Sequence, residues 1–473
     1  MFAQLRKYRE KLNQYDSITA LLNALPDKAL ENTGSALILF LVLSPIMRLI
    51  LSLLFTDVHT LNFTADTLNL GGYWSTYLLQ IGYVSLIVSV VVLSKRVVET
   101  HRDSVSLKAL FKRHFPLILL GGFFLWTIIA TIFSTNVSLS FFGTSYRKEG
   151  LIMFGAYFGF VGISTQIKSL SKIKFLVFIF LLGSAILSWL SIVDSVFLNR
   201  LFTLSQRTSI FHNPNHYGYY LTLVLLSGAG YLLYVKRYDW MYFIVGISFI
   251  TNTITLIISQ SIGPYIGVIG GLGVLSVFTV WHHKLLIKKL CIILIIFVIA
   301  SFYESVQTQY LSSEASGISQ DVSSIVRNTE DASSAGSGRY RLWTLGITYG
   351  NNNILSGHGP DNLGSLYRMD DVRNDRAHNE FIQYYATLGI IGVTLYTSML
   401  LSYAYMFLTK NRHHDLLNMI LFSVIVGYKV SALFGNTMYY TAPFYFTILS
   451  LALTRIYKFD CDSTFEAVTN TAL

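Results

Sequence analysis

Arginine and histidine residues recur in four polar segments of this sequence, each beside an apolar stretch. The segments are FGTSYRKEGL around Arg147, QRTSIFHNPNHYGYYL around Arg207, GSGRYRLW around Arg339 and Arg341, and RNDRAHNEF around His378. A guanidinium group offers planar, bidentate hydrogen bonds to phosphate oxygens, and a neutral imidazole can accept a proton from a hydroxyl near neutral pH. Together these residue types predict a site that holds a diphosphate and activates a hydroxyl group.

His378 stands where an apolar segment begins. Asn379 and Glu380 follow it directly, and both residue types are typical of the start of a helix. The positive end of such a helix favours a neutral imidazole and attracts an anion. His378 is therefore the predicted general base. The alternative is that its ring only packs at the membrane interface.

Four further residues are predicted to support this site. Asn215 lies in the sequence NPN, where proline favours a turn and asparagine can cap the following helix. Trp343 belongs to a predicted short helix over 339–350. Asn379 follows the candidate base. Lys429 lies within an apolar segment, from which it can reach a polar cavity or extend to the membrane surface.

Metal ions and nucleotides have little support in the sequence. Asp370, Asp371 and Asp375 could bind a hard cation, but arginines stand between them and would neutralise their charge. No P-loop and no glycine-rich motif after a strand is present. We therefore expect no metal site and no cofactor. The other histidines are expected to be structural or flanking polar residues, among them His216, His282, His283, His413 and His414.

The composition places these segments in a membrane protein. Hydrophobic residues make up 53% of the 473 residues and charged residues 13%, with a mean hydropathy of +0.52. These values exclude an ordinary soluble domain and a disordered chain. A membrane-spanning helix needs about 20 apolar residues. Twelve apolar runs are predicted spans: 34–55, 73–94, 115–134, 150–166, 175–194, 216–235, 241–258, 263–281, 290–303, 381–407, 416–434 and 443–457.

The basic residues predict the orientation of these spans. The formal net charge is +10, and most lysines and arginines fall on the side that holds both termini. The positive-inside rule therefore makes both termini cytoplasmic. On the other side the cations are almost all arginine, which favours phosphate recognition over general surface charge.

The chain then divides into five predicted regions. They are a cytoplasmic amphipathic segment (1–33), spans one to nine (34–303), a large extracytoplasmic loop with the candidate motifs (304–380), spans ten to twelve (381–457) and a cytoplasmic tail (458–473). The first segment is predicted to form a helix on the inner membrane surface that stops near Pro26. The first part of the loop is rich in serine and is expected to be loosely ordered.

The order of the motifs resembles that of the O-antigen ligase and O-antigen polymerase family of bacterial membrane proteins. The strongest similarity runs from GRYRLW through GHGPDNL to AHNEFIQYYATLGIIGVTLY, and weaker similarity covers FGTSYRKEGL and RTSIFHNPNHYGYYL. Twelve spans with a large loop between the ninth and tenth also resemble this family. Two features depart from it. Ile262 stands where members often carry an arginine that Lys429 could replace, and the proline before the Gly-x-Gly turn is absent.

The resemblance implies a GT-C-like glycosyl-group transferase that needs no metal or cofactor. Its donor would be a glycan on undecaprenyl pyrophosphate, used at the outer face of the bacterial cytoplasmic membrane. His378 would be the base or would orient the acceptor. Arg147, Arg207 and either Arg339 or Arg341 would hold the diphosphate. The acceptor would be another lipid-linked repeat unit, a glycolipid or polymer of the teichoic-acid or capsular type, or a protein hydroxyl.

Two other classes of function fit parts of the sequence. A transporter or flippase for lipid-linked glycans also suits twelve spans with both termini inside, but carriers commonly have repeated halves and polar sites at the membrane midplane. A non-catalytic glycan-binding subunit predicts that loss of His378 leaves function intact. The candidate groups gather on one face, which favours the transferase. No feature indicates a nucleic-acid partner.

Overall fold

The computed structural model describes residues 15–54, 70–102, 107–196, 204–211, 213–309, 313, 335–336, 338–410, 412–436 and 438–456. Within these ranges the chain is helical and has no strand beyond an isolated bridge between Ser205 and Ser209. The prediction of an all-α protein is confirmed for this part of the chain.

Each of the twelve predicted apolar segments coincides with a helix. The helices are α3 (Asp27–Leu54), α4 (Leu70–Arg102), α5 (Leu107–Ile132), α7 (Leu151–Ser164), α8 (Leu170–Val196), α9 (Pro214–Tyr234), α10 (Trp240–Ile258), α11 (Ile262–His282), α12 (Ile287–Thr308), α16 (Glu380–Thr409), α17 (Leu416–Ala432) and α18 (Ala442–Arg455). Among the described residues, eight segments are long and apolar enough to cross a membrane, in α3, α4, α5, α8, α10, α11, α12 and α16. The chain is therefore a multi-pass helical membrane protein, and the count of twelve spans stays a prediction.

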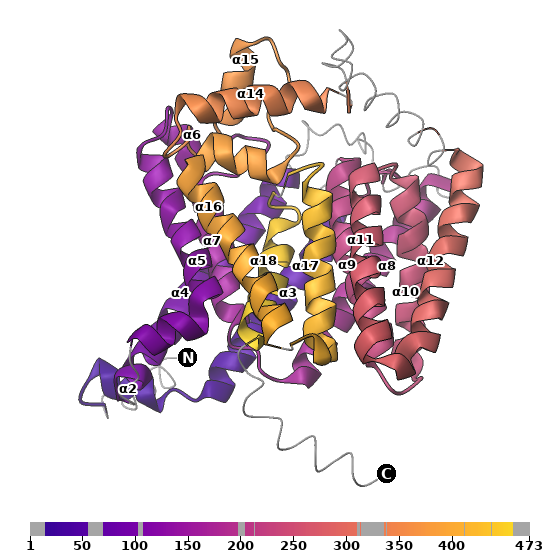
Figure 1. Cartoon of the computed structure of the whole chain (residues 1–473), viewed down its shortest axis with the longest axis horizontal. Coiled ribbons are helices and arrows are strands. Elements are labelled where there is room, and N and C mark those ends of the chain that lie inside the picture. Colours follow the sequence, from indigo (N-terminus) through magenta and orange to yellow (C-terminus); the bar gives the residue numbers. More distant parts are fainter. Residues whose placement is uncertain are drawn as a thin grey trace.

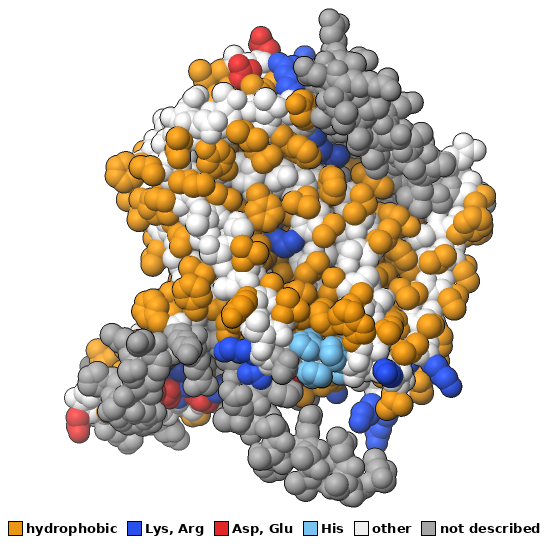
Figure 2. Space-filling view, viewed as in Figure 1, with side chains coloured by type: hydrophobic (Ala, Val, Ile, Leu, Met, Phe, Trp, Pro, Cys, Tyr) orange, Lys and Arg blue, Asp and Glu red, His pale blue; other side chains and the backbone are white. Residues whose placement is uncertain are grey.

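The long helices stand side by side in one bundle with a distinct cover at each end (Figure 1). One end carries α6 (Val137–Phe142), α14 (Arg339–Asn352) and α15 (Leu363–Met369), and we call it the α14 end. The other carries α2 (Ile18–Ala24), and we call it the α2 end. Figure 2 shows the bundle from the same side. Apolar side chains cover most of the middle of the face in view, and most charged side chains lie toward the two ends. Such a distribution suits a lipid-facing surface.

Helix α9 lies inside the bundle. Every residue from His216 to Leu233 is buried, and the helix contacts α8, α10, α11 and α17. Glycines allow this close packing, because a Cβ atom at Gly230 would lie 2.2 Å from a side-chain carbon of Ile420.

Helix α16 is broken at Gly389, where φ is +68°. The loop after α14 pairs with the backbone on both sides of the break. The amide groups of His358 and Gly359 donate to Ala386 O and Thr387 O at 3.0 and 2.8 Å. A Cβ atom at Gly357 would lie 2.4 Å from the carbonyl carbon of Thr387, so only glycine allows this approach. The Gly-x-Gly motif thus fixes the loop against α16, beside the candidate site.

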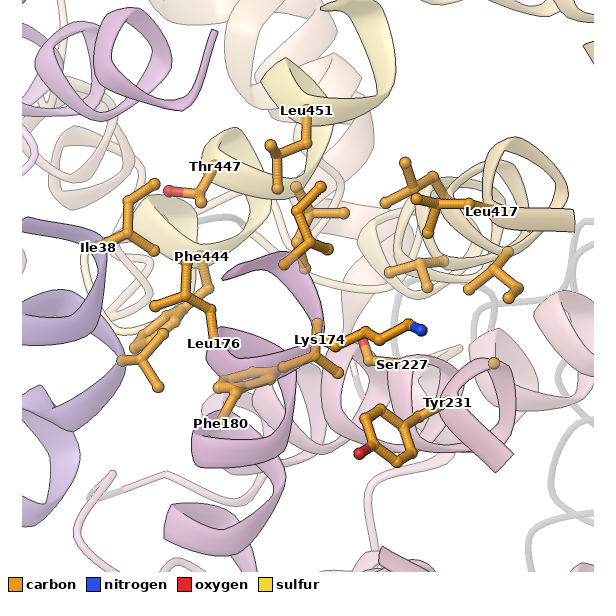
Figure 3. A pocket seen from close by; sticks show the side chains of 18 of the residues that line it. Ile38, Lys174, Leu176, Phe180, Ser227, Tyr231, Leu417, Phe444, Thr447 and Leu451 are labelled. Carbon is orange, nitrogen blue, oxygen red and sulfur yellow. The ribbon is translucent and has the colours of Figure 1, made fainter. Parts of the chain in front are cut away.

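An apolar cavity of about 110 Å³ lies between α3, α8, α9, α17 and α18 (Figure 3). Its walls include Phe180 and Leu451, and among the described residues Lys174 is the one charged side chain that lines it. The cavity offers almost no polar group, so it is not the diphosphate-binding site that the sequence predicts.

Three sequence predictions fall largely outside the described residues. They concern residues 1–14 of the amphipathic segment, residues 310–312 and 314–334 of the serine-rich stretch, and residues 457–473 of the tail. Next to the first of these, α2 begins after Ser17, whose side chain accepts a hydrogen bond from Ala20 N at 3.1 Å. Helix α3 begins directly after Pro26.

Candidate functional site

Arg147 lies in the tight turn between α6 and α7. Thr144 shapes this turn, because its hydroxyl accepts a hydrogen bond from Arg147 N at 3.1 Å. The buried guanidinium group of Arg147 binds Asp375 through two hydrogen bonds, Nε to Oδ2 and Nη2 to Oδ1, both 2.8 Å long. Its Nη1 lies 2.9 Å from Nε2 of His216. Arg147 therefore joins the α6–α7 turn, the start of α9 and the loop before α16.

A second arginine–aspartate pair lies beside the first. Nη2 of Arg376 donates to Oδ1 of Asp361 at 2.6 Å, and both side chains are buried. The other oxygen of Asp361 accepts hydrogen bonds from the backbone of Thr144 and Glu149 at 2.6 and 3.2 Å. Because each buried charge has an opposite charge and further hydrogen bonds, the network is satisfied electrostatically. It fixes the α6–α7 turn against the loop that carries His378.

The aspartate that binds Arg147 stays ionised. Burial alone would raise the pKa of Asp375, but the hydrogen bonds and charge of Arg147, with the charge of Arg376, lower this pKa to about 2. At neutral pH the Arg147–Asp375 pair is therefore an ion pair. Together the two pairs hold two positive and two negative charges.

His378 lies at the end of this loop, immediately before α16. Its φ is +50°, a left-handed conformation, and Asn379 then caps α16 by accepting hydrogen bonds from the amides of Phe381 and Ile382. Burial and the charges of Arg339 and Arg147 lower the pKa of His378 to about 4. The imidazole is therefore neutral at pH 7. The hydrogen bonds found for the described residues include none to its ring, so a nitrogen is available to accept a proton.

The two neighbouring arginines of α14 have different surroundings. Arg339 is the first residue of α14 and exerts the largest charge effect on His378. Arg341 is exposed, and its Nη2 donates to the carbonyl of Asp370 at 3.2 Å. The structure therefore brings Arg339 to His378 and directs Arg341 toward the end of α15.

The remaining predicted site residues are placed differently from one another. Arg207 is exposed, in the turn before α9. Oδ1 of Asn215 accepts a hydrogen bond from the Ser261 hydroxyl at 2.7 Å, which links α9 to α11. Trp343 is half-buried on α14, and its Nε1 has no hydrogen-bond partner among the described residues. None of these three side chains contacts the Arg147 network in the part of the chain described.

Lys429 is engaged inside the bundle. Its ammonium group hydrogen-bonds to Glu380, at the start of α16, and lies 4.0 Å from the ring centre of Tyr445. Its side chain is 12% exposed. Glu380, two residues after His378, balances the charge of this lysine.

Several residues of this network had no site role in the predictions from the sequence. His216 was expected to be structural, yet its ring contacts Arg147, and its other nitrogen is buried without a hydrogen-bond partner. Glu149 is buried and accepts a hydrogen bond from Tyr157. Burial raises the pKa of Glu149 to about 8, against the lowering effects of Arg376 and Tyr157. The available signal was position, because His216 and Glu149 both stand at the starts of helices that open toward the α14 end.

A small cavity with several polar lining residues lies beside the Arg376–Asp361 pair. Its walls include Glu149, Asp361, Arg376, Glu380 and Asn436. Oδ1 of Asn436 is buried and has no hydrogen-bond partner among the described residues. The α14 end thus combines a neutral imidazole, several guanidinium groups and a polar interior.

Comparison with known families gives one match within this chain. The family model described as O-antigen ligase matches residues 247–397, a segment that includes Arg339 and His378. No curated protein matches the chain at a significant level. The resemblance found in the motifs is therefore confirmed for residues 247–397, the segment of the chain that matches the O-antigen ligase family.

Proposed function

We propose that this protein transfers a glycan from undecaprenyl pyrophosphate to an acceptor hydroxyl at the outer face of the bacterial cytoplasmic membrane. The observation that carries the proposal is the neutral imidazole of His378 beside the guanidinium groups of Arg339 and Arg147. The family match supports glycan transfer of the O-antigen ligase or polymerase type. In this proposal the α14 end faces outward, as the positive-inside rule predicts.

Arg339 and Arg207 are the arginines best able to contact the diphosphate directly. Neither side chain forms an ion pair within the described residues, whereas Arg147 and Arg376 each bind an aspartate. Arg147 adds positive charge to the same end and holds the loop that carries His378, so we assign it mainly a positioning role. Arginine suits such a site because it offers several donors in one plane and keeps its charge.

The proposed reaction is a single displacement at the anomeric carbon. The acceptor O–H gives its proton to the free nitrogen of His378 while the acceptor oxygen bonds to that carbon. The bond from the same carbon to the diphosphate oxygen breaks, and undecaprenyl pyrophosphate leaves with the electron pair. Guanidinium groups stabilise the developing negative charge, which replaces the need for a metal ion. Attack opposite the leaving group inverts the anomeric configuration.

The arginines explain how His378 can act as a base despite its low pKa. In the free protein, burial and then the charges of Arg339 and Arg147 lower this pKa to about 4. A bound diphosphate brings negative charge close to the same arginines and offsets their effect. We therefore infer that donor binding raises the pKa of His378 and so prepares it for the acceptor.

The supporting residues have proposed structural roles around this reaction. Asn379 fixes the start of α16 and with it the backbone of His378. Lys429 balances the charge of Glu380 at the start of α16, and Asn215 holds α9 against α11. Trp343, with its unpartnered Nε1, is a candidate contact for the glycan. The acceptor is a cell-surface glycolipid or teichoic-acid-type polymer for a ligase, another repeat unit for a polymerase, or a protein for an O-oligosaccharyltransferase.

The test compares cells that make wild type or His378→Ala at matched protein levels. Surface glycan is measured, and lipid-linked intermediates are resolved by size. Accumulation of single repeat units would identify a polymerase, and accumulation of long lipid-linked chains would identify a ligase. Arg368→Ala is the matched control, because this α15 arginine is exposed and, among the described residues, its side chain hydrogen-bonds to Ser365 alone, at 3.3 Å. Unchanged pools in His378→Ala would refute the proposal and favour a transporter or a binding subunit.

A further inference from the structure

Three histidines gather at the α2 end, far from His378 along α16. His282 is the last residue of α11, and His413 and His414 belong to the turn η3 (Arg412–His414) between α16 and α17. The ring centre of His282 lies 4.4 Å from each of the other two, which are 4.6 Å apart. Figure 2 shows histidine side chains gathered on the surface at this end.

The ring nitrogens are close enough to share one ion. One nitrogen from each histidine lies within 4.8 Å of the other two. In a tetrahedral zinc site with bonds of about 2.0–2.1 Å, ligand nitrogens stand about 3.3 Å apart. Small rotations of these exposed and half-buried side chains would bring the nitrogens from within 4.8 Å to the separation that zinc requires. His282 and His413 are half-buried, whereas His414 is exposed and leaves a path for entry.

The surroundings prepare His413 as a ligand. Its Nδ1 lies 3.4 Å from the carbonyl oxygen of Phe407, so Nδ1–H can donate there and leave the lone pair of Nε2 free. Metal-binding histidines commonly have such a backbone partner on the second nitrogen. The turn itself is held by Asp415, whose amide donates to Arg412 O at 3.1 Å and whose side chain caps α17.

We propose that His282, His413 and His414 bind one divalent transition-metal ion, Zn²⁺ by preference, with water as the fourth ligand. Three imidazoles suit zinc and its neighbours and not Mg²⁺ or Ca²⁺, which take oxygen ligands. The ion joins the end of α11 to the turn between α16 and α17. Its role is structural, because no part of the proposed glycan site lies at this end.

The test uses the full-length protein without a histidine tag, purified in detergent and stripped with a chelator. Zn²⁺ is added, unbound metal is removed, and the metal retained per chain is measured together with the unfolding temperature. We expect one equivalent of zinc and a higher unfolding temperature that a chelator reverses. Co²⁺ in place of Zn²⁺ should give the intense visible absorption of a tetrahedral site.

Variants make the result specific. His414→Ala is the first choice because this exposed side chain is the least able to disturb folding, and we expect zinc affinity to fall by at least about tenfold. His413→Gln should have the same effect. His114→Gln, on α5, is the control that keeps binding. Failure to retain zinc, or equal retention by wild type and both cluster variants, would overturn the proposal. Neither outcome bears on His378, since glycan transfer is measured separately.

Discussion

Two groups of histidines occupy opposite ends of the same bundle and differ in their neighbours. At the α14 end, His378 stands among arginines, whose charges help burial to lower its pKa to about 4. At the α2 end, His282 stands among other imidazoles. A neutral ring beside cations suits proton transfer to an incoming group and binding of an anion, whereas rings that face each other suit a shared cation. The neighbouring residues thus determine which chemistry a histidine side chain can perform.

The sharpest test of this comparison measures both glycan transfer and zinc retention in one variant from each end. His378→Ala should lower glycan transfer by about 10²–10⁴-fold, the usual contribution of a general base, and leave zinc retention unchanged. His414→Ala should show the reverse pattern. Both variants are assayed for transfer with lipid-linked donor and for bound metal. Loss of transfer in His414→Ala with a normal unfolding temperature would break the comparison.

The two arginines of α14 provide the next largest effect. Arg339→Ala should slow transfer, because it should remove about 2–4 kcal/mol of transition-state stabilisation, by analogy with the removal of an oxyanion donor. Arg341→Ala should have a clearly smaller effect, because its side chain turns to the carbonyl of Asp370. Initial rates at saturating and limiting donor separate binding from the chemical step. A larger loss in Arg341→Ala would reverse our assignment.

The Arg147–Asp375 ion pair, which positions the loop, should contribute to stability. Asp375→Asn leaves the Arg147 guanidinium without its counter-charge and should lower the free energy of unfolding by about 2 kcal/mol, given that Asp375 is 30% exposed. The lowered pKa of Asp375, about 2, stabilises the fold above pH 4, and this contribution is lost as the pH falls through 2. The difference between wild type and variant should therefore shrink below pH 4.

Thermal unfolding at pH 7 and near pH 3 measures this difference. Asp371→Asn serves as the control, since Asp371 is exposed in the same loop. Equal stability of wild type and Asp375→Asn at pH 7 would mean that the ion pair does not hold the loop.

The smallest expected effect is a shift in pH dependence. For wild type, kcat/KM should persist to about pH 5 and fall as the pH passes through 4, because His378 in the free protein has a pKa of about 4. Arg339→Ala removes one lowering charge, so its acid limb should move to higher pH. The limb is measured from initial rates across this range. An identical limb in both proteins would show that Arg339 does not act on His378.

Much of the fold followed from hydrophobic patterning. All twelve apolar runs lie in helices. Asn213, the first asparagine of the NPN motif, caps α9, and Asn379 caps α16, so both motifs mark helix starts as expected. These features are local, because run length and capping residues depend on neighbours along the chain. The meeting of Arg147 with the His378 loop was also expected, since both segments face the same end.

The pairing of charges did not follow from the sequence. Arginines beside Asp375 were expected to neutralise it, but its partner is Arg147, 228 residues away. Arg376 instead binds Asp361. Adjacent side chains in an extended loop point in different directions, so proximity along the chain does not choose the partner. The histidine cluster was missed for a similar reason, because His282 and His413 meet only once α11 and α17 have packed.

The burial of α9 from His216 to Leu233 has a consequence for how the protein enters the membrane. Helix α9 contains several tyrosines and glycines, and it is not among the eight described helices that are able to span a bilayer by length and composition. A segment that never faces lipid in the finished bundle needs less hydrophobicity, but it also enters the bilayer less readily by itself. We expect α9 to insert together with α8 and α10 during synthesis, so that the helix on which the bundle is assembled depends on its neighbours for its place in the membrane.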